Sequence, residues 1–411
     1  MIKKRAYSKT KPTVLDIFCG AGGLSLGFQN AGCQIVGGID INPHAVKTHH
    51  KNFSNTTINL SATDITQINL NQLGLNPGEI DILVGSPPCQ VFSTVGISKM
   101  RHLGRNLEED PRSFLYLQFI NFLNYFRPNF FVMENVNTLK NKPIFSQICE
   151  EISYGIKGFK ESYPGYEIEY KILLSADYGV PQLRKRLFVI GKRKETDFTL
   201  VFPKGINKTD YVSVGEAISD LPNLQPISMP LGSRCSRSKQ VDNEKPYFCE
   251  PSTSYQEKMR NNKKADEGVL NHICRSHNDL DLKIFSLMKQ GDLYRDIPDE
   301  LKRYRSDIFA DKYKRLRWDS PSWTLTAHMK KDGLAYIHPI QHRSISVREA
   351  ARLHSFPDDF IFDAPMTGMF ELIGNSVPPL MAEAIARPIV QQLQAYYRDC
   401  SSESDMIEAQ A

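Results

Sequence analysis

Long apolar runs are missing from this chain of 411 residues. A helix that crosses a bilayer needs about 20 consecutive apolar residues, and no stretch of the sequence reaches that length. The basic start Met1-Ile2-Lys3-Lys4-Arg5 leads into no apolar core of the kind that a secretory signal carries. We therefore expect a cytoplasmic protein that does not bind membranes.

Paired cysteines are missing as well. The eight cysteines have irregular spacing and include no Cys-x-x-Cys pair, which argues against a disulfide framework and against the standard zinc modules. His272, Cys274 and His277 lie close together in the sequence, downstream of Cys235 and Cys249. Their spacing matches no usual zinc pattern, so we expect no bound metal.

The chain begins with a strand, a glycine-rich turn and a helix. Residues 14–18 form an apolar run of strand length, followed by Cys19-Gly20-Ala21-Gly22-Gly23 and a helical segment over 24–30. Such glycines let a ligand approach the backbone closely. The spacing Gly-x-Gly-x-x-Gly is absent, which disfavours a nicotinamide-dependent oxidoreductase. A second strand, 35–39, ends at Asp40, where a carboxylate can accept hydrogen bonds from ribose hydroxyls.

A rigid loop follows the next strong strand. The apolar run 81–84 leads into Gly85-Ser86-Pro87-Pro88-Cys89-Gln90, so Cys89 lies just past the carboxyl end of a strand, where ligands bind in open α/β sheets. The two prolines restrict the turn. A free thiol with a pKa of about 8.5 is mostly protonated at pH 7, so a nucleophilic Cys89 needs a cationic neighbour.

Further charged residues fall at the same predicted edge. Strand 130–133 ends at Glu134, and Arg184 and Arg186 alternate on one face of a later extended segment. The polar loop over 96–113 is long for a compact domain, and loops of that length usually cover a binding site.

The positive charge is concentrated in one segment. Residues 199–343 hold 24 Lys and Arg against 19 Asp and Glu, a surplus of five that equals the net charge of +5 of the whole chain. The basic side chains mix with aromatic ones here, a pattern that suits contacts with nucleic-acid phosphates. The densest run contains Lys312, Lys314, Arg315 and Arg317.

Regular structure is expected again near the C-terminus. Ser346 and Glu349 form a capping box ahead of a helix that ends near Phe356-Pro357-Asp358. A final helix runs to about residue 397, and residues from 401 on are expected to form a disordered tail.

Taken in order, these motifs resemble those of the DNA cytosine-5 methyltransferases. The resemblance covers nearly all of residues 13–191 and 346–390. It rests on Asp16-x-Phe18-Cys19-Gly20-x-Gly22-Gly23, Asp40, Pro87-Pro88-Cys89-Gln90-x-Phe92-Ser93, Glu134-Asn135-Val136, Gln182-x-Arg184-x-Arg186, Arg348-Glu349-Ala350 and Gly374-Asn375-Ser376-Val377.

The resemblance implies an α/β fold of two domains. Residues 1–195 and 372–411 would form a Rossmann-like catalytic domain that binds S-adenosylmethionine, and residues 196–371 a smaller, mixed target-recognition domain. S-adenosylmethionine, and after reaction S-adenosylhomocysteine, would contact Phe18, Gly20, Gly22, Gly23, Leu24, Asp40, Ile41, Asp64, Ile65, Pro87, Asn375 and Val377. Ile41 stands where many members of the family have a larger side chain.

The implied chemistry is methylation of carbon 5 of cytosine. Cys89 would add to carbon 6, Glu134 would bind ring nitrogen 3, and Arg184 and Arg186 would lie near the flipped base. The loop 97–113 would close over that base. Double-stranded DNA would be contacted by Gln90, Ser93, Arg112, Gln182, Lys312, Lys314, Arg315 and Arg317.

Other functions are less favoured. Methyltransferases that act on exocyclic amines carry an aromatic residue after the paired prolines, where this chain has Cys89. An RNA methyltransferase of the same family would share most motifs and differ mainly in the target region. A catalytically dead scaffold would be expected to have lost Cys89 or Glu134.

The expected role is that of a modification enzyme in a type II restriction-modification system, acting as a monomer. Whether a cognate endonuclease acts on the same site does not follow from the sequence. The recognised DNA sequence does not follow from residues 199–343, because no code links these side chains to bases.

Overall fold

The computed structural model describes residues 9–54, 56–58, 61–88, 114–156, 163–226, 228–229, 244–261, 263, 267–305 and 312–408. The chain divides into two compact units, which are considered separately. The first comprises Met1–Leu174, Lys185–Gly205 and Val377–Ala411, and the second comprises Ser175–Arg184 and Ile206–Ser376. This division differs from the expected domains mainly at residues 175–184, which belong to the second unit although the sequence on both sides belongs to the first.

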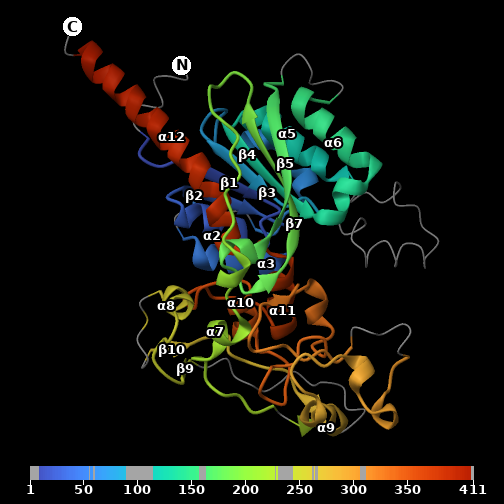
Figure 1. Cartoon of the computed structure of the whole chain (residues 1–411). Coiled ribbons are helices and arrows are strands. Elements are labelled where there is room, and N and C mark those ends of the chain that lie inside the picture. Colours follow the sequence, from blue (N-terminus) through green and yellow to red (C-terminus); the bar gives the residue numbers. More distant parts are fainter. Residues whose placement is uncertain are drawn as a thin grey trace. The chain divides into compact units, whose positions relative to one another are not determined.

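A sheet of six strands forms the centre of the first unit (Figure 1), in the order β2-β1-β3-β4-β7-β5. Strands β2, β1, β3 and β4 are parallel, and β7 runs antiparallel to both β4 and β5. The parallel-rich α/β fold expected for this part of the chain is therefore confirmed. The strands are β1 (Thr13–Ile17), β2 (Gln34–Ile39), β3 (Ile82–Gly85), β4 (Phe130–Val136), β5 (Tyr166–Leu174) and β7 (Lys185–Arg193).

Both faces of the parallel part of this sheet, β1 to β4, are buried. Side chains alternate along a strand, and Leu15 and Ile17 of β1 belong to a core cluster together with Phe119 and Phe122 of a helix. Val14 faces the opposite side and is fully buried too. Apolar residues on both faces are expected for parallel strands that helices cover on two sides.

Helices of the first unit pack in two groups. Helices α5 (Tyr116–Phe126) and α6 (Pro143–Tyr154) contact β3 and β5, whereas α2 (Gly23–Asn30) packs along α12 (Pro379–Glu408). That second pair is close because Gly27 lacks a side chain: a Cβ there would lie 2.4 Å from the Cβ of Ala382. Helix α3 (Pro43–Asn52) contacts β2. Since α12 continues to Glu408, the expected disordered tail is wrong for residues 401–408.

The second unit consists of short elements. Within the residues of this unit that the structure describes, paired two-residue strands take the place of an extended sheet. One of these pairs joins Ser322–Trp323 to Gln182–Leu183. The elements are β6 (Gln182–Leu183), α7 (Val214–Ile218), β8 (Ser228–Met229), β9 (Lys245–Pro246), α8 (Ser254–Arg260), β10 (Gly268–Val269), β11 (His277–Asn278), α9 (Asp279–Leu287), β12 (Ser322–Trp323), α10 (Val347–Leu353) and α11 (Met366–Asn375).

Buried charges hold the second unit together. The capping box expected before α10 is confirmed: the Ser346 hydroxyl accepts from the Glu349 N–H, and the Glu349 carboxylate accepts from the Ser346 N–H. Arg343 also donates to Glu349, with its Nη1 at 2.7 Å. Arg352 lies between two carboxylates, with its Nη2 2.6 Å from Asp358 and Nη1 3.2 Å from Asp220. Such pairs are costly to break, because one partner is then left buried and unpaired.

Candidate active site

The ends of four parallel strands bring the expected site residues of the first unit into one row. Ile17 of β1 pairs with Ile39 of β2 and with Gly85 of β3, and Gly85 pairs with Met133 of β4. The residues that follow in each strand or just after it are Phe18, Asp40, Ser86 and Glu134. The carboxyl edge of the sheet therefore collects the glycine-rich turn, Asp40, the Pro87-Pro88 turn and Glu134, as the sequence predicts.

The glycine-rich turn adopts left-handed backbone conformations. Phe18 has a φ of 58°, Gly20 a φ of 54° and Gly22 a φ of 97°. A Cβ added at Gly20 would meet no atom within 4 Å, so the space over this part of the turn is open. The Asp40 carboxylate holds the turn in place, because it accepts hydrogen bonds from the Gly20 N–H at 2.9 Å and the Asn42 N–H at 2.8 Å.

These residues fit a nucleoside ligand. The half-buried Asp40 carboxylate accepts one backbone N–H on each oxygen, which leaves lone pairs for hydroxyl donors. Burial raises the pKa of Asp40, and the backbone donors oppose that shift. Next to it, Ile41 is 66% exposed, although apolar side chains of this size are usually buried. An apolar ring could cover Ile41 while hydroxyls bind Asp40.

Other residues expected to bind the cofactor have local structural roles. Asp64 caps a short 3-10 helix (Ile65–Gln67), accepting from the Thr66 N–H at 3.0 Å. Ile65, Leu24 and Pro87 are buried. Three more residues are expected to contact the cofactor. Gly23 starts α2. Asn375 is exposed at the end of α11 in the second unit, and Val377 is buried in the first unit.

Glu134 is held by an arginine from the neighbouring strand. The Glu134 side chain is nearly buried, and its Oε1 lies 3.0 Å from Nε of Arg186, the second residue of β7. Burial lowers the pKa of Arg186, and the charge of Glu134 opposes that shift. The two residues are brought together by the antiparallel pairing of β4 with β7. The pair fixes a carboxylate at the sheet edge.

Asn135 belongs to the Glu134-Asn135-Val136 motif, which predicts no separate role for it. Its side-chain amide donates to the Pro87 carbonyl at 3.2 Å, and its carbonyl accepts from the Val136 N–H. Asn135 therefore ties the Pro87-Pro88 turn to the end of β4. The expected nucleophile Cys89 lies outside the described residues, as do Gln90, Ser93, Arg112 and the loop 97–113.

Arg184, expected at the reacting base, and Gln182, expected to contact DNA, both have partners inside the second unit. The guanidinium of Arg184 is buried and donates to the backbone carbonyls of Leu325 at 2.7 Å, Gly374 at 3.0 Å and Ser376 at 3.1 Å. The fully buried Gln182 amide contacts Leu353 and His354 and accepts from the Leu325 N–H. The expectations of catalysis by Arg184 and DNA contact by Gln182 are therefore corrected: burial and internal partners occupy both side chains.

The expected phosphate contacts also divide. Arg315 is buried and all of its donor groups point inward, so the expectation that it binds DNA is corrected. Arg317 is exposed, with Nε 3.4 Å from Asp319. Lys312 forms an ion pair with Asp332, and Nζ of Lys314 lies 4.8 Å from the centre of the Trp323 ring. The carbonyl partners of Arg315 belong to Phe285, Met288, His338 and Gln341.

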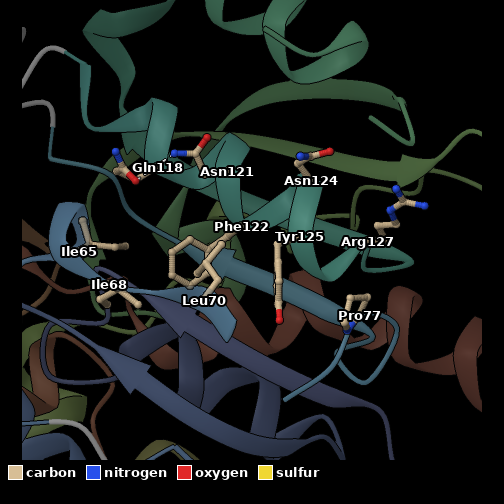
Figure 2. Close-up of a pocket in the computed structure, with 10 residues that line it drawn as sticks. All are labelled: Ile65, Ile68, Leu70, Pro77, Gln118, Asn121, Phe122, Asn124, Tyr125 and Arg127. Carbon is tan, nitrogen blue, oxygen red and sulfur yellow. Dashed lines mark hydrogen bonds between the residues drawn. The ribbon is translucent and has the colours of Figure 1, made fainter. Parts of the chain in front are cut away.

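A cavity of about 630 Å³ opens beside the core of the first unit (Figure 2). Phe122 and Tyr125 extend from α5 toward the segment that carries Ile65, Ile68 and Leu70. The lining of this cavity is apolar and amide-rich and contains neither Glu134 nor Arg186, so we place the chemistry at the strand ends instead.

In the parts of the chain that the structure describes, no cluster of His, Cys, Asp and Glu could hold a metal ion, and no helix is long and apolar enough to span a membrane.

Comparisons with known proteins agree with this geometry. The family of C-5 cytosine-specific DNA methylases matches residues 12–391. The type II methyltransferase M1.HphI of Haemophilus parahaemolyticus is 32% identical over 92% of this chain and 87% of its own length. The type II methyltransferase M.DdeI of Desulfomicrobium norvegicum is 31% identical over 92% and 88%.

A solved structure shares the fold. It is described as a DNA modification methyltransferase encoded within an Escherichia coli prophage, and it has a TM-score of 0.71 and 25% identity over 93% of this chain and 99% of its own. A match across nearly the whole chain, and relatives above 30% identity over most of both lengths, leave one conclusion: this protein belongs to the C-5 cytosine-specific DNA methylase family, whose members are S-adenosylmethionine-dependent DNA methyltransferases.

Proposed function

We propose that this enzyme methylates carbon 5 of one cytosine within a specific duplex DNA site, through a covalent adduct with Cys89, as the modification enzyme of a type II restriction-modification system. The observation that carries the proposal is the Glu134–Arg186 pair, at 3.0 Å, at the strand edge that also holds Asp40 and the Pro87-Pro88 turn. Cys89 follows that turn directly in the sequence.

S-adenosylmethionine, when bound, supplies a methylsulfonium group as the electrophile. The chain's part is to hold the nucleoside end: Asp40 accepts hydrogen bonds from the ribose hydroxyls, and Ile41 packs on the adenine. The turn Gly20 to Gly23 lets the ligand approach the backbone. Asp64 has one carboxylate oxygen engaged as a cap, and the other is proposed to accept from the adenine amine.

The chain's residues make carbon 5 reactive. The Cys89 thiolate adds to carbon 6 of the cytosine, which turns carbon 5 into an enamine-like nucleophile. Glu134 enters in its protonated form and gives its proton to ring nitrogen 3, and the carboxylate that results accepts from the exocyclic amine, so that negative charge developing in the ring is neutralised. Arg186 keeps the Glu134 carboxylate in position, and its positive charge favours the thiolate form of a nearby cysteine. After methyl transfer, the carbon 5 proton is lost to solvent, Cys89 leaves as a thiolate, and ring nitrogen 3 returns its proton to Glu134, which restores the aromatic ring.

The target base must leave the duplex before this chemistry can occur. A base in the stack cannot be reached, and extruding it costs about a few kcal/mol. We assign recognition of the surrounding sequence to the second unit, because the chain's whole surplus of positive charge falls within residues 199–343. The exposed Arg317 and the partly exposed Lys312 and Lys314 would contact phosphates.

The relatives M1.HphI and M.DdeI are named as type II methyltransferases. On that basis we propose a cognate endonuclease that cuts the same site when it is unmethylated, and a monomeric methyltransferase in the cytoplasm.

One experiment tests the activity and the target together. Bisulfite sequencing of DNA from cells that express the enzyme should show 5-methylcytosine at one short sequence and nowhere else. Replacing residues 199–343 by the corresponding segment of a relative should move methylation to another site. If the methylated site stays the same after the exchange, the assignment of recognition to this segment is wrong. Labelling of transfer RNA rather than duplex DNA would contradict the substrate.

A further inference from the structure

Three buried polar side chains form a chain beneath the glycine-rich turn. The Asp16 Oδ2 atom accepts from the Ser25 N–H at 3.2 Å and from the Ser25 hydroxyl at 2.7 Å. The Ser25 hydroxyl in turn lies 3.0 Å from Nε2 of His49. The three residues come from β1, α2 and α3, and each is 0% exposed. No step of the proposed reaction uses them.

His49 fits tightly under the turn. A Cβ added at Gly38 would lie 2.5 Å from its Nε2, and one added at Gly22 would lie 3.0 Å from its Cδ2. The Phe53 ring packs on the imidazole with ring centroids 4.4 Å apart. Two glycines are therefore needed to make room for this histidine, one of them the residue that precedes α2.

The three hydrogen-bonded side chains can hold or lose one proton while all of their hydrogen bonds to one another remain formed. A hydroxyl has a single proton to donate, so Ser25 can donate to Asp16 or to His49, but not to both. When Asp16 is a neutral acid, it donates to Ser25, which donates to His49. When Asp16 is ionised, Ser25 donates to Asp16, and Nε2 of His49 donates to Ser25. Both arrangements are complete, and they differ in the tautomer of His49.

The surroundings bring the first of these groups close to titration at neutral pH. Burial raises the pKa of Asp16 to about 7, and the Ser25 hydrogen bonds oppose this shift. Burial also lowers the pKa of His49 to about 3, so its ring stays neutral. Asp16 Oδ1 and His49 Nδ1 have no hydrogen-bond partner among the described residues. The other titratable groups that interact electrostatically with Asp16 or His49 are Asp40, Cys19 and His50, and α3 further carries His44, Lys47 and Lys51.

We propose that Asp16, through this chain with Ser25 and His49, releases one proton to solvent when a cationic ligand binds over the glycine-rich turn and keeps it when the ligand is neutral. The inference rests on the proposed function. The methyl donor carries a sulfonium cation, and its product S-adenosylhomocysteine carries an uncharged thioether in the same place. A cation favours the ionised carboxyl beneath the turn, whereas the thioether leaves the buried acid protonated. Asp16 is thus a positioning residue whose ionisation discriminates between the charged methyl donor and its uncharged product.

Linkage gives the size of the effect. A carboxyl that titrates near pH 7 is about one-tenth ionised at pH 6 and about nine-tenths ionised at pH 8. If donor binding requires the ionised form and product binding does not, the affinity for the donor relative to the product rises about tenfold between these pH values. At pH 7, donor binding should release about half a proton and product binding close to none from this group.

Isothermal titration calorimetry in phosphate and in Tris measures the protons released, because the two buffers have different ionisation enthalpies. We expect the wild-type chain to release about half a proton more with S-adenosylmethionine than with S-adenosylhomocysteine at pH 7, and Asp16→Asn to abolish this difference. Comparison with Asp16→Asn also subtracts the titration of the ligands' own amino groups. The matched control His44→Gln changes a histidine of α3 that is not hydrogen-bonded to Asp16 or Ser25. This variant should keep the difference in proton release between the two ligands.

A second variant covers the case in which Asp16→Asn does not fold. Ser25→Ala removes the hydroxyl that stabilises the ionised carboxyl, so the pH at which the donor-to-product affinity ratio changes should move upward. Equal proton release with both ligands, persistence of the difference in Asp16→Asn, or an unchanged midpoint in Ser25→Ala would each overturn the inference. Failure of the wild-type chain to bind either ligand would instead contradict the proposed function.

Discussion

Nε of Arg186 lies 3.0 Å from Oε1 of Glu134. Two residues earlier in the sequence, Arg184 belongs to the other unit and donates to three backbone carbonyls there. Two arginines that look equivalent in the sequence therefore have different partners: one orients a carboxylate at the strand edge, and the other stabilises the second unit.

Replacing these arginines one at a time should separate activity from stability. Arg186→Gln removes the charge that orients Glu134 but leaves an amide that can still donate to it, so methyl transfer to duplex DNA should fall at least about tenfold, and the unfolding midpoint should fall less than in Arg184→Gln. Arg184→Gln leaves buried carbonyls without donors, which should lower the free energy of unfolding by about 3 kcal/mol. Methyl transfer from labelled cofactor and urea unfolding give the two readings. Equal loss of stability in both variants would contradict the distinction.

Asp40 should control cofactor affinity. Asp40→Asn replaces one carboxylate oxygen by an amide nitrogen, so the Gly20 and Asn42 N–H groups and the ribose hydroxyls can no longer all be accepted. We expect the dissociation constant for S-adenosylmethionine to rise at least about tenfold, as measured by calorimetry, while binding of duplex DNA stays close to that of the wild type. An unchanged dissociation constant would remove Asp40 from the cofactor site.

DNA affinity should distinguish Arg317 from Arg315. Arg317→Ala removes an exposed cation, so it should weaken binding to all duplexes alike and flatten the salt dependence by roughly one unit. Arg315→Ala should destabilise the second unit, because four carbonyls lose a buried donor. Filter binding over a salt series and thermal unfolding measure the two effects. A change confined to one base pair of the site would show that Arg317 reads bases.

Mild acid should destabilise the second unit. Burial lowers the pKa of His272 and of His277 to about 4, and that of His338 to about 3. Because the unfolded chain binds protons near pH 6.5 and the folded one does not, stability is present above pH 6.5 and falls as the pH drops below it. At pH 5 each histidine should cost about 2 kcal/mol.

Hydrogen exchange of peptides from residues 206–376 can follow this loss between pH 7.5 and pH 5, after correction for the intrinsic pH dependence of exchange. His277→Gln should reduce the acid sensitivity, since the amide does not titrate. Protection that is the same at both pH values would contradict the assignment of neutral, buried histidines.

Local patterns in the sequence predicted much of the first unit. Apolar runs of strand length located β1, β2, β3 and β4, and the residues just after them proved to be neighbours because parallel strands end at one edge. The capping box at Ser346 was also predictable, since both of its partners lie within one helical turn.

What the sequence could not reveal was the burial of individual polar side chains. The family resemblance implies ligand-binding roles for Arg184 and Gln182, and the basic run over residues 312–317 predicts phosphate contact by Arg315. Each is instead buried against backbone groups that are more than 20 residues away in the sequence. Partners at such separations leave no local pattern. Residues 175–184 belong to the second unit for the same reason: a partner far away in the sequence, Ser322–Trp323 of that unit, pairs with Gln182–Leu183.

The covalent adduct at Cys89 tests the central claim most directly. Release of the enzyme after methyl transfer requires loss of the proton on carbon 5, and fluorine at that position cannot leave as a cation. Duplex DNA with 5-fluorocytosine at the target should therefore trap the enzyme in a complex that survives denaturing electrophoresis and requires S-adenosylmethionine. Peptide mass spectrometry should locate the bond at Cys89, and Cys89→Ser should form no adduct. Trapping that persists in Cys89→Ser, or that maps to Cys19 or Cys149, would contradict the account.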